Sequence, residues 1–405
     1  MRHLTGNIFV ALFAVSAMCA CAGIDFPLTP DASDDAGTPD KGDVTEPGNE
    51  DAGDAAPKGD PKGYVVTTYA GSTTGKSGVA DSDDPLQATF SGPWGIAFGP
   101  DGSLYVADTY NDEIRKIAVN GKVSTYAGTG ATPQTYVDGN CDQATFHHPS
   151  GLAVDAKDNV YVADSNNSVI RMITATPCKV TTLAGRGTSG DVSGTGTDAA
   201  FGEPDRLALN ASGTFLYVTD YVNNKIQQVT LPGGVVTTLA GQGENNAGYA
   251  NGSLSNATFT NPRGVALDTN TGTLYVSESH DIRKIENGTV SLLAGSNVGA
   301  YGFVDAAGAN ARFDTPASLA VDADGNLYVA DSYNHAVRKV SPDGMVTTFA
   351  GTRDDISGVG ESGAEDGPAN QATFDSPSSV AVDANGVVYV SDVNNNNIRK
   401  ITPVY

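Results

Sequence analysis

The sequence predicts an all-β fold made of six similar units, because three short motifs recur along the chain. The first is a β-hairpin with a polar turn, the second is a strand that ends in Ala-Gly, and the third is a Phe-x-x-Pro lead-in to an apolar strand. Each motif occurs six times, and successive Ala-Gly markers are 57, 57, 56, 54 and 56 residues apart. Each unit therefore holds four short strands.

The hairpin is clearest at residues 325–340, GNLYVADSYNHAVRKV. A run rich in β-branched and aromatic residues leads into a polar turn, and a second apolar run follows, which is the pattern of two paired strands. The other copies are SLYVADTYNDEIRKI (103–117), NVYVADSNNSVIRMI (159–173), FLYVTDYVNNKIQQV (215–229), TLYVSESHDIRKI (273–285) and VVYVSDVNNNNIRKI (387–401).

The two other motifs supply the outer and inner strands of each unit. The Ala-Gly strands are VVTTYAG (65–71), KVSTYAG (122–128), KVTTLAG (179–185), VVTTLAG (235–241), TVSLLAG (289–295) and MVTTFAG (345–351). The inner strands follow ATFSGP (88–93), ATFHHP (144–149), AAFGEP (199–204), ATFTNP (257–262), ARFDTP (311–316) and ATFDSP (372–377). One four-stranded sheet cannot cover both its apolar faces, so units of this length stack around an axis. The predicted architecture is a six-bladed β-propeller of four-stranded antiparallel blades.

The two ends of the repeat region predict how the ring closes. The last unit ends at Tyr405 without its fourth strand, whereas a spare fourth strand, Tyr64 to Ala70, precedes the first unit. If the N-terminal strand completes the C-terminal blade, no open sheet edge remains to pair with another chain.

These repeats resemble the NHL repeat. The resemblance is carried by P-x-G-x-A-x-D, then G-N-x-Y-V-A-D, then N-x-x-I-R-K, and it covers residues 63–405. It implies a six-bladed propeller that acts mostly as a binding platform for proteins or other ligands, with a few enzymatic relatives.

Two segments precede the repeats. Residues 1–21 have a basic lead and an apolar core too short to span a bilayer, as in a signal peptide. The end of this segment, Met-Cys-Ala-Cys, resembles a degenerate lipobox, with Cys21 a better candidate for lipidation than Cys19; the alternative is an ordinary signal peptide with an incidental cysteine. Residues 22–62 are rich in Asp, Pro and Gly and predict a disordered tether to a bacterial outer membrane or cell surface.

Composition excludes some partners. The net charge of −24 makes nucleic acid and anionic lipid headgroups poor partners, because phosphate binding needs clustered Lys and Arg. We therefore expect a monomer that touches the membrane only through its lipid anchor.

A carboxylate and an arginine recur at fixed spacing in the hairpins, and we interpret them as structural. A residue that recurs in every blade is expected to stabilise the stacking of the blades and not to take part in catalysis. A carboxylate at a strand end can bind turn amides and a guanidinium together. The pairs are Asp108 with Arg115, Asp164 with Arg171, Glu278 with Arg283, Asp331 with Arg338 and Asp392 with Arg399, while Asp220 faces Gln227.

Function is expected where the repeats differ, in the loops around the mouth of the central channel. The residues after the recurring Pro form an irregular ring there, and Trp, Tyr and Arg are frequent interface anchors. Trp94 serves equally well as a plug for the channel. The candidate ligand-binding residues are Trp94, Tyr110, Asp205, Arg206, Arg263 and Tyr333, and the predicted function is capture of a protein, peptide or glycan on this face.

An enzyme is the alternative, most plausibly a metal-assisted lyase or a lactonase-like hydrolase. A catalytic zinc needs three protein ligands and an open position. His147, His148, His280 and His335 lie in three blades, but none belongs to the ring after the recurring Pro, and the inner strands carry no carboxylate within GIAF, GLAV, RLAL, GVAL, SLAV and SVAV. We therefore assign no catalytic residue, metal or cofactor.

Cys141 and Cys178 are a candidate disulfide, since unpaired cysteines in an oxidising compartment tend to pair. Cys141 lies in the loop that enters the second blade, and Cys178 precedes its outer strand, nominally on the opposite face. The path of the long loop decides whether they meet.

Overall fold

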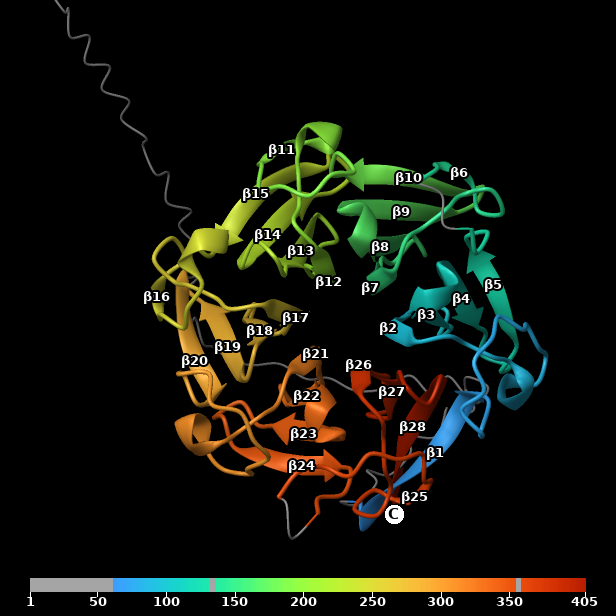
Figure 1. The fold of residues 1–405 in the computed structure, drawn as a ribbon, viewed down its shortest axis with the longest axis vertical. Helices are drawn as coiled ribbons and strands as arrows, with labels where there is room; N and C mark the ends of the chain where they lie inside the picture. The colour runs from blue at the N-terminus through green and yellow to red at the C-terminus, as the bar shows by residue number, and fades with distance from the viewer. Residues whose placement is uncertain (1–60, 132–135, 355–357) are drawn as a thin grey trace, which may run out of the picture. The chain divides into compact units, whose positions relative to one another are not determined.

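The computed structural model describes residues 61–131, 136–354 and 358–405. Six small antiparallel sheets are arranged radially around one axis (Figure 1). The longest helix in these ranges is a three-residue 3-10 turn, which confirms the all-β prediction. The described residues include no helix long and apolar enough to cross a membrane. The predicted signal segment, the lipidation of Cys21 and nearly all of the tether lie outside the described residues.

Each blade contains four strands in antiparallel order from the axis outwards. The inner strands, which begin at the recurring Pro, are β2 (Pro93–Phe98), β7 (Pro149–Val154), β12 (Pro204–Leu209), β17 (Pro262–Leu267), β21 (Pro316–Val321) and β26 (Pro377–Val382). The second strands, which end at the recurring acid, are β3 (Leu104–Asp108), β8 (Val160–Asp164), β13 (Phe215–Asp220), β18 (Leu274–Glu278), β22 (Leu327–Asp331) and β27 (Val388–Asp392).

The outer half of each blade comes from the Arg-containing and Ala-Gly motifs. The third strands are β4 (Glu113–Ile117), β9 (Val169–Ala175), β14 (Lys225–Thr230), β19 (Asp281–Glu286), β23 (Ala336–Val340) and β28 (Asn397–Val404). The fourth strands are β5 (Val123–Ala127), β10 (Cys178–Ala184), β15 (Val235–Ala240), β20 (Thr289–Gly295), β24 (Val346–Ala350) and, in the sixth blade, β1 (Gly63–Gly71).

The ring closes as predicted. β1 pairs antiparallel with β28, with Val65 opposite Thr402 and Thr67 opposite Lys400, so the N-terminal strand completes the C-terminal blade (Figure 1). Lys62, at the predicted end of the tether, already donates its backbone N–H to the carbonyl oxygen of Val404 at 2.7 Å. Each inner strand also contacts the inner strands of both neighbouring blades, which makes the ring continuous.

Four blades have a short fifth strand that the sequence analysis did not predict. These strands, β6 (Gly139–Asn140), β11 (Gly194–Thr195), β16 (Gly252–Ser253) and β25 (Gly367–Pro368), pair antiparallel with the outer strand of the blade that the chain is about to enter. Isolated bridges, Ser82 with Val123 and Ala307 with Met345, take their place in the first and fifth blades. The long loops therefore run along the outer edge of the propeller before they turn inwards.

Short 3-10 turns lie in the connections: η1 (Pro85–Gln87), η2 (Thr109–Asn111), η3 (Ser165–Asn167), η4 (Gly196–Asp198), η5 (Glu244–Asn246), η6 (Gly308–Asn310) and η7 (Ser332–Asn334).

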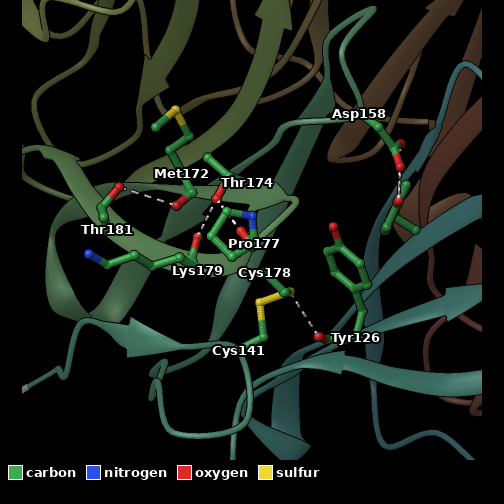
Figure 2. Close-up of a disulfide and its surroundings, with 10 residues drawn as sticks. Tyr126, Cys141, Asp158, Met172, Thr174, Pro177, Cys178, Lys179 and Thr181 are labelled. Atoms are coloured by element: carbon green, nitrogen blue, oxygen red, sulfur yellow. Dashed lines mark hydrogen bonds between the residues drawn. A yellow bond between two sulfur atoms is a disulfide. The ribbon is translucent and has the colours of Figure 1, made fainter.

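This loop path explains the disulfide between Cys141 and Cys178. Pairing of β6 with β10 places Asn140 opposite Lys179, and the two cysteines then lie with their Cα atoms 5.5 Å apart. Figure 2 shows the bond at the outer edge of the second blade, beside Tyr126 of the first. The loop carries Cys141 to the face from which β10 starts, which the order of the strands alone did not show.

The core consists of six apolar clusters, each at a junction between neighbouring blades. The Phe of every lead-in motif is fully buried there, and in five blades the recurring Arg lies 5.1 to 5.5 Å from its ring centre. The guanidinium is thus held between a carboxylate and an aromatic face. These phenylalanines are Phe90, Phe146, Phe201, Phe259, Phe313 and Phe374.

The predicted carboxylate–arginine pairs are confirmed in five blades, where fully buried partners lie 2.5 to 2.9 Å apart. The third blade differs because Gln227 replaces the arginine. Asp220 there accepts hydrogen bonds from Asn223 and from the backbone N–H groups of Gly202 and Glu203, and it forms no ion pair with a cation in the described part of the chain. Burial raises the pKa of Asp220 to about 6, with the hydrogen bonds opposing the shift.

At every blade junction, a hydroxyl group next to the recurring acid donates to a backbone carbonyl of the next inner strand. In three blades this hydroxyl follows the recurring acid, and in the other three it precedes it. The bonds run from Thr109 to Pro149, Ser165 to Pro204, Thr219 to Arg263, Ser277 to Ala317, Ser332 to Pro377 and Ser391 to Trp94, at 2.5 to 3.5 Å. The ring of six bonds fixes the inner strands relative to one another.

Candidate ligand-binding site

Two loops of every blade meet on one face of the propeller, which we call the mouth. One is the loop that enters the inner strand, and the other joins the second and third strands. Backbone hydrogen bonds tie them together, from Tyr110 N–H to Ser91, Tyr221 N–H to Glu203 and Tyr333 N–H to Asp314, at 2.9 to 3.1 Å. The side chains that differ between blades are therefore presented on a rigid frame.

Two hollows lie at the mouth. The first hollow, of about 370 Å³, is lined by Trp94, Thr109, Tyr110, His148, Ser150, Ser165, Asn166, Glu203, Asp205, Tyr221 and Arg263. The second hollow, of about 280 Å³, is lined by Trp94, Tyr110, Arg263, Thr315, Ala317, Ser332, Tyr333, Ser376, Ser378, Val393 and Asn394.

Five of the six predicted ligand-binding residues line these hollows. Trp94, Tyr110 and Arg263 line both hollows, Asp205 lines the first and Tyr333 the second. Trp94 and Tyr110 belong to the first blade and Arg263 to the fourth, so the shared residues come from opposite sides of the ring. The two hollows therefore meet along these three side chains.

Arg206 does not line either hollow, contrary to our expectation. It is 5% exposed, and its guanidinium donates to Asp205 at 2.5 Å and to the hydroxyl and carbonyl oxygens of Ser378 at 2.7 and 3.2 Å. Because Ser378 belongs to the sixth blade, Arg206 bridges the channel beneath the mouth. Burial lowers the pKa of this arginine, and Asp205 opposes that shift. Arg206 therefore positions Asp205 and links two blades.

Trp94 is half-buried, and its position is compatible with both expected roles, contact with a ligand and closure of the channel. Its carbonyl oxygen accepts from the Ser391 hydroxyl at 2.8 Å, which fixes its backbone. Its indole Nε1–H is buried and has no hydrogen-bond acceptor among the described residues. The ring lines both hollows, so a ligand in either one would contact it.

Sequence reasoning missed Tyr221, Glu203 and His148, which also line the first hollow. The positions of the inter-blade hydroxyl groups in the sequence explain how Tyr221 could have been predicted. In the third blade Thr219, before the recurring acid, donates the inter-blade hydrogen bond. Tyr221, after the acid, is therefore not needed for that bond and lines the hollow. Glu203 and His148 precede the recurring Pro, a position that the sequence analysis did not include in the ring.

The first hollow contains charged groups of both signs. The guanidinium of Arg263 lies 5.0 Å from the ring centre of Tyr221. Burial and the nearby Asp205 raise the pKa of Glu203, while Arg263 opposes the shift. Among the described residues, neither Glu203 nor Arg263 has an ion-pair partner within 4.0 Å. Both charges are therefore available to a ligand.

Two of the histidines, His280 and His335, act in the joints between blades. The Nδ1 atoms of His280 and His335 accept the backbone N–H groups of Thr315 and Ser376 in the next blades, at 3.3 and 3.1 Å. Asp112, Asn224 and Asn396 accept the equivalent N–H groups in other blades. No group of three or more His, Cys, Asp or Glu side chains within the described ranges is arranged to hold a metal ion.

A larger hollow of about 450 Å³ lies away from the mouth, between the hairpins that join the first and second strands of the fifth and sixth blades. Three of its charged side chains already have partners: Lys339 lies 5.4 Å from the ring centre of Tyr328, and Asp322 and Asp383 accept the N–H groups of their own turns. The mouth is therefore the better candidate site.

Comparisons with known proteins agree with the geometry. The chain is 33% identical over 283 residues to Protein SUPPRESSOR OF QUENCHING 1, chloroplastic, of Arabidopsis thaliana, covering 66% of this chain and 26% of that protein. It is 31% identical over 329 residues to NHL repeat-containing protein 2 of Homo sapiens, covering 73% of this chain and 44% of that protein. The chain thus spans less than half the length of these relatives.

Solved structures share the fold. An auxiliary nutrient binding protein from Bacteroides ovatus aligns with a TM-score of 0.63 and 21% identity, over 85% of this chain and 77% of that one. The model of the Teneurin NHL domain matches residues 72–174 and 303–402, which together make up half of the chain. With six NHL-type repeats closed into a propeller, this chain belongs to the family of the Teneurin NHL domain.

Proposed function

We propose that this protein is a binding module that captures a protein, peptide or glycan ligand at the mouth of the propeller. The observation that carries the proposal is the convergence of Trp94, Tyr110 and Arg263 from opposite blades onto two adjoining hollows. Trp, Tyr and Arg are the side chains that most often dominate binding energy. Blades that are alike along their strands differ at these positions, where stacking imposes no common residue.

The size and lining of the hollows support this function. Small-ligand sites have volumes of about 300 to 1,000 Å³ and combine aromatic walls with a few polar groups. The first hollow, at about 370 Å³, falls within this range and the second, at about 280 Å³, lies just below it. A solved propeller of this fold carries the name auxiliary nutrient binding protein, which fits a binding role although its ligand need not be shared.

We further propose that the module is exported and held at a bacterial outer membrane or cell surface by a lipid on Cys21. Support comes from the signal-like residues 1–21, the acidic tether of residues 22–62 and the disulfide between Cys141 and Cys178, since disulfides persist in oxidising compartments. The propeller then acts as a monomer that does not bind nucleic acid.

A pull-down from the parent cell surface tests the function. Trp94→Ala and Arg263→Ala should each weaken capture about thirtyfold, which corresponds to about 2 kcal/mol for an interface anchor. Asp324→Ala, an exposed residue of the hollow away from the mouth, is the control and should leave capture unchanged. Full capture by both mouth variants, together with loss in the control, would show that the opposite face binds the partner.

A further inference from the structure

The first hollow holds two opposite charges that do not meet. Glu203 and Arg263 lie on neighbouring blades, at the residues before and after the recurring Pro. The side chains of Glu203 and Arg263 form no ion pair within 4.0 Å and no hydrogen bond with another of the described residues. Asp205, the other acid of this hollow, is already paired with Arg206 at 2.5 Å. The hollow therefore offers one available anion and one available cation.

Both residues are held in place by their neighbours. The Arg263 guanidinium packs on Tyr221, 5.0 Å from the ring centre, and the Arg263 carbonyl oxygen accepts the Thr219 hydroxyl at 2.6 Å. The carbonyl oxygen of Glu203 accepts the backbone N–H of Tyr221 at 2.9 Å. Tyr221 thus connects the two charged residues, and a rigid frame of this kind reduces the entropy that a ligand must overcome on binding.

A ligand with charges of both signs fits this arrangement better than a neutral or singly charged one. A cationic group can bind at Glu203 and an anionic group at Arg263, and each contact is then a charge-assisted hydrogen bond in a partly buried site. A ligand with only one charge leaves the opposite protein charge without a partner while it removes water from it, which is unfavourable.

The rest of the hollow is suited to an apolar or aromatic side chain. Trp94 and Tyr110 supply aromatic surface beside the charged pair, and the volume of about 370 Å³ limits the ligand to a small molecule or the end of a chain. The second hollow adds hydroxyl groups, an Ala, a Val and Tyr333, but its only charged residue is the shared Arg263. The charged ends of a ligand therefore belong in the first hollow.

We propose that the first hollow binds an amino acid or a very short peptide with free termini, its ammonium group at Glu203 and its carboxylate at Arg263. This inference rests on the proposed binding function of the mouth and assigns the class of ligand. Burial and Asp205 together hold the pKa of Glu203 above its usual range, and a ligand ammonium would relieve that effect of the second acid.

Isothermal titration calorimetry with the full chain tests this assignment. The probes are the twenty amino acids and the dipeptides and tripeptides of Leu, Phe and Gly, each free, N-acetylated or C-amidated, together with neutral oligosaccharides. At least one free compound should bind, and acetylation or amidation should each weaken it roughly ten- to hundredfold, as for the loss of one charged hydrogen bond. The optimal length distinguishes an amino acid from a peptide.

Variants link each end of the ligand to one residue. In Glu203→Gln the acetylated and free compounds should bind alike, and in Arg263→Gln the amidated and free compounds should bind alike. Glu244→Gln and Arg186→Gln, which remove the same charges at exposed positions elsewhere, should retain the wild-type preference for free termini. Because the readout is a ratio between two ligands on one protein, partial unfolding of a variant cannot imitate it.

Two results would overturn the assignment. One is the absence of binding by every free amino acid and peptide at millimolar concentration. The other is equal binding of free and blocked compounds by the wild type. If an oligosaccharide binds and Trp94→Ala abolishes that binding while Glu203→Gln does not, the ligand class is wrong and the binding function of the mouth stands.

Discussion

Removal of the buried carboxylate Asp331 should destabilise the fifth blade strongly while sparing the mouth. Asp331 is fully buried, and its oxygens accept the backbone N–H of Asp314 at 2.8 Å, the side-chain amide of Asn334 at 2.8 Å and the guanidinium of Arg338 at 2.7 Å. In Asp331→Ala all three donors lose this acceptor, and the Arg338 charge remains buried. Arg338 then keeps only its bonds to Asp305 and to the carbonyl of Arg312.

The expected loss is about 3 to 5 kcal/mol in the free energy of unfolding, as for removal of one member of a buried ion pair, because the buried guanidinium then keeps only the half-exposed Asp305 as an anionic partner. The double variant Asp331→Ala/Arg338→Met should lose less than the sum of the two single variants, since it also removes the buried guanidinium that lost its buried partner. The third blade provides a natural control. Gln227 takes the place of the arginine there, so Asp220→Ala should cost only about 1 to 3 kcal/mol, the penalty for unpaired donors such as the Asn223 amide.

Urea unfolding measured by circular dichroism gives these free energies, and titration with whatever ligand the mouth binds reports on the site. Folded Asp331→Ala should bind with wild-type affinity. A loss below about 1 kcal/mol, or strict additivity in the double variant, would refute the structural role of the pair. A folded variant that no longer binds would show that the pair also acts at the mouth.

Three further predictions concern stability. Cys141→Ser/Cys178→Ser should lose up to about 4 kcal/mol, because the bond closes a loop over a sequence separation of 37 residues; reductant should lower the melting temperature of the wild type to that of the variant and leave the variant unchanged. Burial raises the pKa of Asp220 to about 6. Between about pH 4 and pH 6 the folded protein therefore keeps a proton on Asp220 that the unfolded chain has lost. Asp220 should therefore lower stability by up to about 3 kcal/mol over this window as pH rises. Burial also raises the pKa values of Asp331 and Asp392 to about 6, so Asp220→Asn should make the slope in urea titrations shallower by the Asp220 contribution only. Burial lowers the pKa of His335, whose Nδ1 accepts the Ser376 N–H, so the neutral form stabilises the fold and this contribution should be lost as pH falls below about 6.5. His335→Asn, which copies Asn396 of the sixth blade, should melt like the wild type at pH 7 and above it at pH 5; equal melting temperatures at both pH values would contradict the role of the imidazole.

The sequence by itself determined the fold, the ring closure and the buried carboxylate–arginine pairs. Strand periodicity is local, and six copies in register leave few arrangements that bury all apolar faces. The position of the strand from Tyr64 to Ala70 could be predicted because the last unit lacks its fourth strand. The pair of Asp331 with Arg338 was predicted from its recurring spacing; in the hairpin Arg338 lies opposite Val329, and its side chain reaches diagonally to Asp331, two residues along the same strand.

The tertiary structure decided which side chains reach the hollows and where the long loops run. Asp205 and Arg206 are adjacent in the sequence, yet only Asp205 lines the first hollow, because Arg206 turns inwards to Ser378 of a blade half a ring away. Glu203 and Tyr221 reach the same hollow through a backbone hydrogen bond between two loops. Likewise, Cys141 meets its partner because the loop before it pairs along the outer edge of the blade. Contacts across the ring and between loops depend on the closed shape of the whole propeller, which no single repeat encodes.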